Sequence, residues 1–111
     1  MPRLTLSDFA DALAPLLAEP YRPGTSDPEI AAVANNSAVV GPGTLFLAVR
    51  GAKTDGHRFL PDALARGASA VVVAADFDGP TPSDVPALRV TDSYFAWSIV
   101  CETFFGRPKL R

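Results

Sequence analysis

The sequence predicts a single α/β domain with three layers, in which a mostly parallel sheet of about four to five strands is flanked by helices. Three observations predict this fold class. Apolar segments follow the order helix, strand, strand, helix, strand, strand, helix. Residues 70–74 are apolar without alternation, as in a strand covered on both faces. A chain of 111 residues can bury a core without disulfides, so residues 1–111 are expected to fold as one unit.

The first element is an amphipathic helix that we expect to begin at Ser7 and to end near Ala18. Ser7 can cap the helix, and Asp8 suits the positive end of its dipole. The apolar residues that recur at helical spacing are Phe9, Leu13, Leu16 and Leu17. Pro15 lies inside this segment, where a proline costs about 3 kcal/mol, so a kink or a break is expected there.

Two strands are expected next, at residues 30–34 and 44–49, with a turn at residues 41–43 between them. A helix at residues 57–66 follows, and Gly67 is expected to end it. The strand at residues 70–74 comes directly afterwards. Proline clusters at residues 20–28 and 80–86 mark the two longer loops.

The last strand is expected at residues 87–90, and residues 91–93 all offer caps for the helix that follows it. Gly106 and Pro108 stop this helix. Its apolar stripe is expected to contain Tyr94, Trp97, Cys101, Phe104 and Phe105. We therefore assign Trp97 to the core, and not to stacking on a nucleotide base, and we interpret Cys101 as a small buried hydrophobic residue.

The net charge of −2 argues against nucleic acid as a partner, because binding to phosphate backbones needs clustered positive charge. The longest apolar run, residues 70–75, is far shorter than the ~20 residues of a membrane span. The N-terminus lacks the pattern of a signal peptide, and the single cysteine cannot form a disulfide within the chain. We expect a cytoplasmic protein.

No catalytic or metal-binding constellation is expected. The sequence has one histidine and one cysteine, and it lacks the G-x-S-x-G pattern of a nucleophile elbow. His57 is expected to face solvent in the first turn of a helix, and the alternative is contact with a ligand at the adjacent loop. Neither G-x-x-x-x-G-K-[ST] nor a G-x-G-x-x-G pattern after a strand is present.

The loop at residues 50–56 is the candidate binding site. It leaves the carboxyl end of a predicted strand and enters a helix, which is where open α/β sheets bind ligands. Gly51 and Gly56 allow backbone N–H groups to approach an anion, and Lys53 adds a positive charge. The alternative is an ordinary connection between a strand and a helix.

At this loop the sequence resembles the N-terminal domain of the Mur ligases. The family pattern is D-S-R, then P-G-x-L-F-x-A-x-x-G, D-G-H-x-F and G-A. Its counterparts here lie at residues 36–38, 42–51, 55–59 and 67–68. Residues 104–108 are similar to the F-Y-G-x-P that ends this domain in the ligases that act on UDP-N-acetylmuramoyl-L-alanyl-D-glutamate. The resemblance covers about three-quarters of the chain, from residue 30 onwards.

The resemblance implies a role in peptidoglycan precursor synthesis, in which this domain holds the UDP part of a UDP-muramoyl peptide. ATP and Mg are then expected in a central domain, the incoming amino acid in a C-terminal domain, and the start of the linker at residues 107–111. The segment by itself is not expected to catalyse or to hold a cofactor. By position, the expected UDP-binding residues are Asn36, Ser37, Gly51, Ala52, Lys53, Thr54, Asp55, Gly56 and His57.

Three positions depart from the family pattern. Asn36 replaces an aspartate, Ala38 replaces an arginine, and Tyr94 stands where the last helix often has an arginine. Asn36 can still donate and accept hydrogen bonds. The changes at positions 36 and 38 leave open a degenerate stand-alone module that acts through protein contacts. The N-terminal domain of the ligase that adds D-alanyl-D-alanine is a further alternative because it has a similar pattern, although the ending at residues 105–108 disfavours it.

Overall fold

The computed structural model describes residues 4–19, 21, 27–49, 55–77, 79 and 85–106. Four parallel strands form one sheet in the order β1-β2-β3-β4. The strands are β1 (Ala32–Ala34), β2 (Thr44–Leu47), β3 (Ala70–Ala74) and β4 (Ala87–Val90). The predicted fold class is confirmed.

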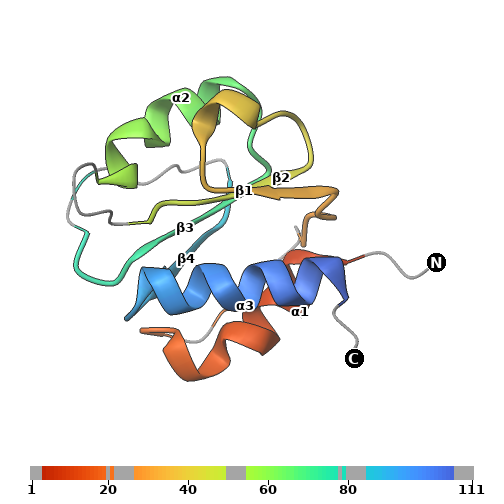
Figure 1. Ribbon diagram of the computed structural model, residues 1–111, viewed down its shortest axis with the longest axis vertical. Helices are drawn as coiled ribbons and strands as arrows, with labels where there is room; N and C mark the ends of the chain where they lie inside the picture. Colours follow the sequence, from red (N-terminus) through yellow and green to blue (C-terminus); the bar gives the residue numbers. More distant parts are fainter. Residues whose placement is uncertain are drawn as a thin grey trace.

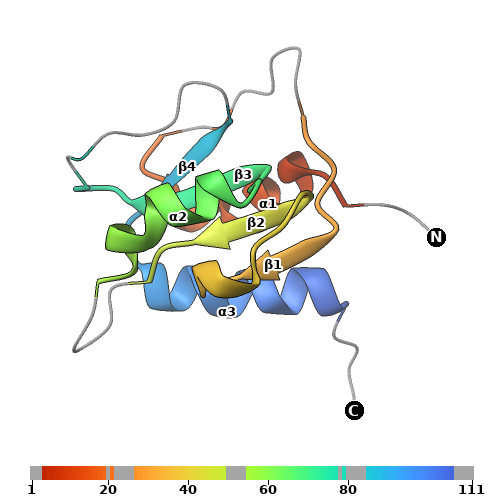
Figure 2. The same cartoon turned by 90° about the horizontal axis from the view of Figure 1, so that it is seen from above.

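Helices cover both faces of the sheet (Figures 1 and 2). Helices α1 (Leu6–Leu13) and α3 (Ser93–Phe105) lie on one face, and α2 (Leu60–Ala65) lies on the other. Three short 3-10 helices complete the described structure, namely η1 (Ala14–Leu16), η2 (Ser37–Val39) and η3 (Gly56–Phe59). The arrangement is the three-layer one that the order of the elements predicts.

The core has two halves, one on each face of the sheet. The strand residues that pack with α1 and α3 are Leu45, Leu47, Ala70, Val72, Leu88 and Val90. Their neighbours in the chain pack with α2 on the opposite face, namely Phe46, Val71 and Val73. All five residues of β3 are buried, as its unbroken apolar sequence predicts, because a strand covered on both faces has no solvent-facing position.

The first helix begins earlier than predicted. Thr5, not Ser7, is the N-cap, and the Asp8 carboxylate accepts the Thr5 N–H at 2.8 Å, as in a capping box. The expected break at Pro15 is confirmed, because the α-helix ends at Leu13 and continues as η1, in whose first turn the proline lies. The end near Ala18 was wrong, since Leu17 is already extended and pairs with Val90 of β4.

Three further elements are shorter than predicted. The strand predicted at residues 44–49 is β2, which already ends at Leu47. The Ile30 N–H donates to the carbonyl of Leu4 at 2.7 Å, so β1 begins only at Ala32. The segment predicted as a helix at residues 57–66 begins as η3, and α2 starts at Leu60 with Pro61 in its first turn, where a missing N–H is tolerated. Gly67 follows the end of α2 with φ +100°, a conformation that favours glycine.

The predicted stripe of α3 was wrong in its orientation. Ala96 and Val100 are fully buried, whereas Tyr94 and Phe105 are 61% and 69% exposed. The rest of the expected stripe, Trp97, Cys101 and Phe104, is partly buried. Small residues face the sheet because they let the helix approach it closely, so the largest side chains lie along the flanks or in solvent. The ends are as predicted, since Asp92 accepts the Phe95 N–H and Gly106 adopts φ +63°.

Candidate functional site

The predicted binding residues follow the carboxyl ends of β1 and β2. These ends lie at the same edge of the parallel sheet, which we call the carboxyl edge (Figure 2). Asn36 and Ser37 come after β1, and Asp55, Gly56 and His57 lie on the path from β2 to α2. The remaining predicted residues, Gly51, Ala52, Lys53 and Thr54, lie outside the described residues. The topology therefore brings the described members of the predicted site to one edge, as open α/β sheets do with ligand-binding residues.

The two residues after β1 differ in exposure. Asn36 is exposed and caps η2, where its Oδ1 accepts the N–H of Ala38 at 2.9 Å. Ser37 is only 6% exposed, and its side chain hydrogen-bonds with Asp62 of α2. This bond, together with that from Arg66, holds the pKa of Asp62 below its ordinary value. Ser37 thus connects η2 to α2, while Asn36 faces the surface.

The backbone between β2 and α2 is fixed at Gly56 by a hydrogen bond. Its N–H donates to the carbonyl of Val49 at 2.8 Å, which joins the two described ends of the loop. A Cβ atom at position 56 would lie 2.8 Å from both the N and the O atom of Val49, so this close approach requires a glycine. Asp55 caps η3 by accepting the His57 N–H at 2.9 Å.

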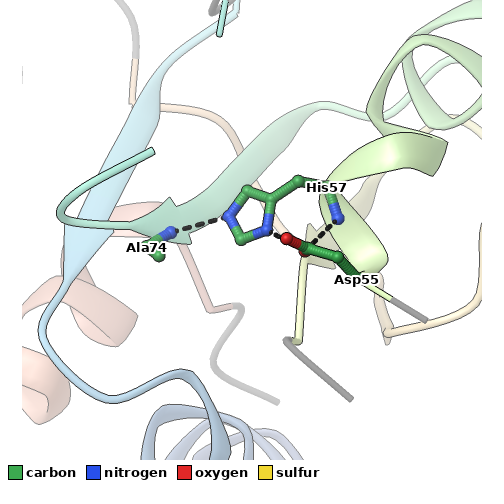
Figure 3. Close-up of polar contacts among 3 residues, drawn as sticks. All are labelled: Asp55, His57 and Ala74. Carbon is green, nitrogen blue, oxygen red and sulfur yellow. Dashed lines mark hydrogen bonds and ion pairs between the residues drawn. The ribbon is translucent and has the colours of Figure 1, made fainter. Parts of the chain in front are cut away.

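His57 is buried, and the expectation that it faces solvent was wrong. Its ring is held at both nitrogens: Nδ1 lies 2.5 Å from Oδ1 of Asp55, and Nε2 accepts the backbone N–H of Ala74 at 2.9 Å (Figure 3). Since an amide N–H only donates, Nε2 must carry a lone pair and Nδ1 the proton. Phe77 stacks on the ring at 4.6 Å. In the 3-10 helix η3 the ring of His57 faces β3, whereas the sequence predicted a regular α-helix with this residue on the solvent side.

A hollow of about 460 Å³ lies at the carboxyl ends of β3 and β4. It is lined by residues 74–76 and 90–94, which include the exposed ring of Tyr94. Asp76 and Thr91 were not predicted as site residues, although they lie within two residues of the ends of predicted strands. A larger hollow of about 610 Å³ lies along α1 and shares no residue with the predicted site.

Cysteine chemistry and metal binding depend on the burial and the grouping of the described side chains. Cys101 is partly buried, and burial raises the pKa of its thiol, which disfavours the reactive thiolate. Within the described ranges, no three His, Cys, Asp or Glu side chains gather as metal ligands. No helix in the described part of the chain is long and apolar enough to cross a membrane.

A four-stranded parallel sheet with helices on both faces defines an open α/β domain, a class in which ligands bind at the carboxyl edge of the sheet. Comparison with known families makes the class specific. Residues 29–92 match the family described as "Mur ligase family, catalytic domain". The chain belongs to the Mur ligase family, and the resemblance predicted from the sequence is confirmed.

Several relatives carry the names of enzymes of peptidoglycan precursor synthesis. The chain is 46% identical over 96 residues to UDP-N-acetylmuramyl-tripeptide synthetase of Roseiflexus sp. (strain RS-1), covering 86% of this chain and 18% of that protein. It is 40% identical over 85 residues to the UDP-N-acetylmuramoyl-L-alanyl-D-glutamate–2,6-diaminopimelate ligase of Geobacillus kaustophilus, covering 77% and 17%. The chain therefore spans about a fifth of the length of these relatives.

A solved structure shares the fold. It is the UDP-N-acetylmuramoylalanyl-D-glutamyl-2,6-diaminopimelate–D-alanyl-D-alanyl ligase from Acinetobacter baumannii, which superposes with a TM-score of 0.69 and 22% identity. The match covers 93% of this chain and 22% of that ligase. At this identity the likeness concerns the fold alone.

Proposed function

We propose that this chain binds the UDP part of UDP-N-acetylmuramoyl-L-alanyl-D-glutamate for an ATP-dependent ligase of peptidoglycan precursor synthesis. The observation that carries the proposal is the 46% identity to a protein named UDP-N-acetylmuramyl-tripeptide synthetase, which extends over 86% of the chain. The gathering of polar residues at the carboxyl edge supports a binding role for this segment.

Within the proposed site, Asn36 lies exposed at the end of β1 and can offer hydrogen bonds to a uracil ring. In the sequence, residues 51–57 follow β2, and Lys53 among them would supply a positive charge for the diphosphate. The aspartate and arginine of the family pattern are missing at positions 36 and 38, so recognition of the base would depend on neutral hydrogen bonds.

ATP and Mg do not fit the residues of this chain. The sequence contains no G-x-x-x-x-G-K-[ST] pattern, and the described side chains form no cluster of metal ligands. We assign both to a central domain of a longer parent chain, with residues 107–111 as the start of the linker to it. The parent would be a cytoplasmic peptide ligase, and this segment alone would not catalyse.

Two other functions are weaker candidates. For the ligase that adds D-alanyl-D-alanine, the likeness at 22% identity concerns the fold alone, whereas the relatives with 40–46% identity carry names of the third-residue ligases. A degenerate module that acts through protein contacts is suggested by the changes at positions 36 and 38.

Amide NMR titration of the chain tests the proposal. UDP should shift the signals of residues 36–38 and 55–57, whereas ADP, which carries the same diphosphate but a different base, and ATP should leave residues 36–38 unshifted. Equal shifts with the adenine nucleotides, or none with any ligand, would contradict the proposal. The double variant Asn36→Asp/Ala38→Arg restores the family pattern, so UDP binding by this variant alone would favour the degenerate module.

A further inference from the structure

At the point where β2 and β3 separate, the His57 side chain accepts a hydrogen bond that β2 would accept in a continuing sheet. The last hydrogen bond between these strands runs from the Ala48 N–H to the Val72 carbonyl, at 2.9 Å. In a continuing parallel ladder the next donor towards β2 would be the N–H of Ala74. That N–H donates instead to Nε2 of His57, at 2.9 Å, so the imidazole extends the edge of the sheet after β2 has turned away.

The ring is locked from its other side as well. Oδ1 of Asp55 accepts both the backbone N–H of His57 and its ring Nδ1–H. Phe77, which follows β3, stacks on the ring, and the Phe77 carbonyl accepts a hydrogen bond from Arg89 of β4 at 2.8 Å. The imidazole is therefore held by Asp55, which follows β2, and by Ala74, the last residue of β3 (Figure 3).

We propose that His57 is a positioning residue, which fixes the Asp55–Gly56 turn against the end of β3 and thereby shapes the carboxyl edge without touching a ligand. Only 6% of the residue is exposed, and both ring nitrogens are used within the chain. The expected effect on UDP affinity rests on the proposed function. The bridge, meaning the contacts of the His57 ring with Asp55 and Ala74, is independent of that function.

Two variants separate the two hydrogen bonds of the ring. The side-chain amide of His57→Gln reaches the position of Nε2, so its oxygen can still accept from Ala74 while the bond to Asp55 is lost. The shorter amide of His57→Asn reaches the position of Nδ1, so it can still donate to Asp55 while the bond from Ala74 is lost. Val100→Ala is the control, because it weakens the core on the face of α3 without touching this edge.

Hydrogen exchange of the Ala74 amide tests the bridge without any ligand. Protection should fall about tenfold or more in His57→Asn and should stay near the wild-type value in His57→Gln and Val100→Ala. Equal protection in all four proteins would overturn the bridge. An equal loss of protection in both His57 variants would do the same, because then only the ring as a whole would matter.

UDP titration tests the consequence for binding. In the wild-type chain the ¹⁵N shifts of the ring should report a protonated Nδ1 and an unprotonated Nε2, and saturating UDP should leave both unchanged. Both His57 variants should bind UDP about threefold to tenfold more weakly, while Val100→Ala binds with wild-type affinity.

A change in the ring ¹⁵N shifts on binding would show direct contact with UDP, and unchanged affinity in both variants would show a purely structural role. Either result overturns the positioning role. If the wild-type chain bound no UDP, the proposed function would fail, and the exchange data alone would decide on the bridge.

Discussion

At the scale of single residues, two of the predicted binding side chains are turned into the protein. Ser37 hydrogen-bonds with Asp62, and His57 joins Asp55 to Ala74. Polar groups that leave water need such partners, because an unpaired buried polar atom is costly. Asn36, in contrast, lies exposed one position before Ser37, although its Oδ1 caps η2. The predicted site therefore combines an exposed residue with buried residues that hold the turns in place.

Ser37→Ala should weaken UDP binding about threefold to tenfold, because it removes the hydrogen bond to Asp62 that holds η2, and with it the exposed Asn36, against α2. Isothermal titration or NMR titration would measure this change. Asp62→Ala is the matched variant, because it removes the partner in α2 and leaves the hydroxyl in place. If both variants lose the same affinity, Ser37 acts through α2 and not by touching the uridine.

Ser37→Ala should also change how the stability of the protein depends on pH. Hydrogen bonds from Ser37 and Arg66 lower the pKa of Asp62 in the folded chain, so the pKa should rise in Ser37→Ala. A lowered folded pKa stabilises the protein above the unfolded pKa, and this stabilisation is lost as the pH falls through the folded value. The stability difference between the two proteins should therefore shrink in acid. Carboxyl ¹³C titration of Asp62 would check the shift.

At the scale of elements, α3 shows that the largest apolar side chains of a helix do not always mark its buried face. Its sequence is apolar nearly all round, so the large residues suggested a stripe, yet the fully buried positions are Ala96 and Val100. Trp97 packs against the core at one flank, and Tyr94 is exposed. The predicted assignment of Trp97 to the core thus holds only in part.

Trp97→Ala should destabilise the fold by about 1–3 kcal/mol, which is less than the ~3–5 kcal/mol expected for a fully buried tryptophan. Tyr94→Ala should stay within about 0.5 kcal/mol of wild type, because it removes an exposed ring. Urea denaturation followed by circular dichroism would compare the two. If both variants lost the same unfolding free energy, the outer face of α3 would be covered in solution.

Since Trp97 is the only tryptophan, its fluorescence also reports whether UDP binds near it, and we expect no change on adding UDP.

At the scale of the whole molecule, the sheet joins two cores that share no side chain. Val72 packs under α1 and α3, and its neighbour Val71 packs under α2. Because both belong to one strand, loss of either layer exposes one face of β3 to water and weakens the sheet on which the other layer packs. The two layers should therefore unfold as one unit.

Val71→Ala and Val72→Ala test this cooperativity as a matched pair. Each should lower the urea midpoint of two probes equally, namely Trp97 fluorescence on the α3 face and the Ala63 amide signal in α2. Separate midpoints for the two probes, or a variant that shifts only the probe on its own face, would contradict a single cooperative domain.

The sequence by itself determined the elements and their order. An unbroken apolar run predicted a strand covered on both faces, Pro15 predicted the end of α1, and Gly67 and Gly106 predicted the ends of α2 and α3. These signals are local, because backbone freedom and strand periodicity depend on a residue and its near neighbours. The family pattern in turn predicted which loops meet at the carboxyl edge.

Only the tertiary structure decided which way the side chains of that edge face. His57 is buried because the N–H of Ala74, seventeen residues further along the chain, needs an acceptor where β2 turns away. Ser37 faces inwards because α2 brings Asp62 beside it, and α3 presents its small residues because the helix lies close to the sheet. Each of these outcomes depends on a partner that is distant in sequence, and local periodicity contains no information about such partners.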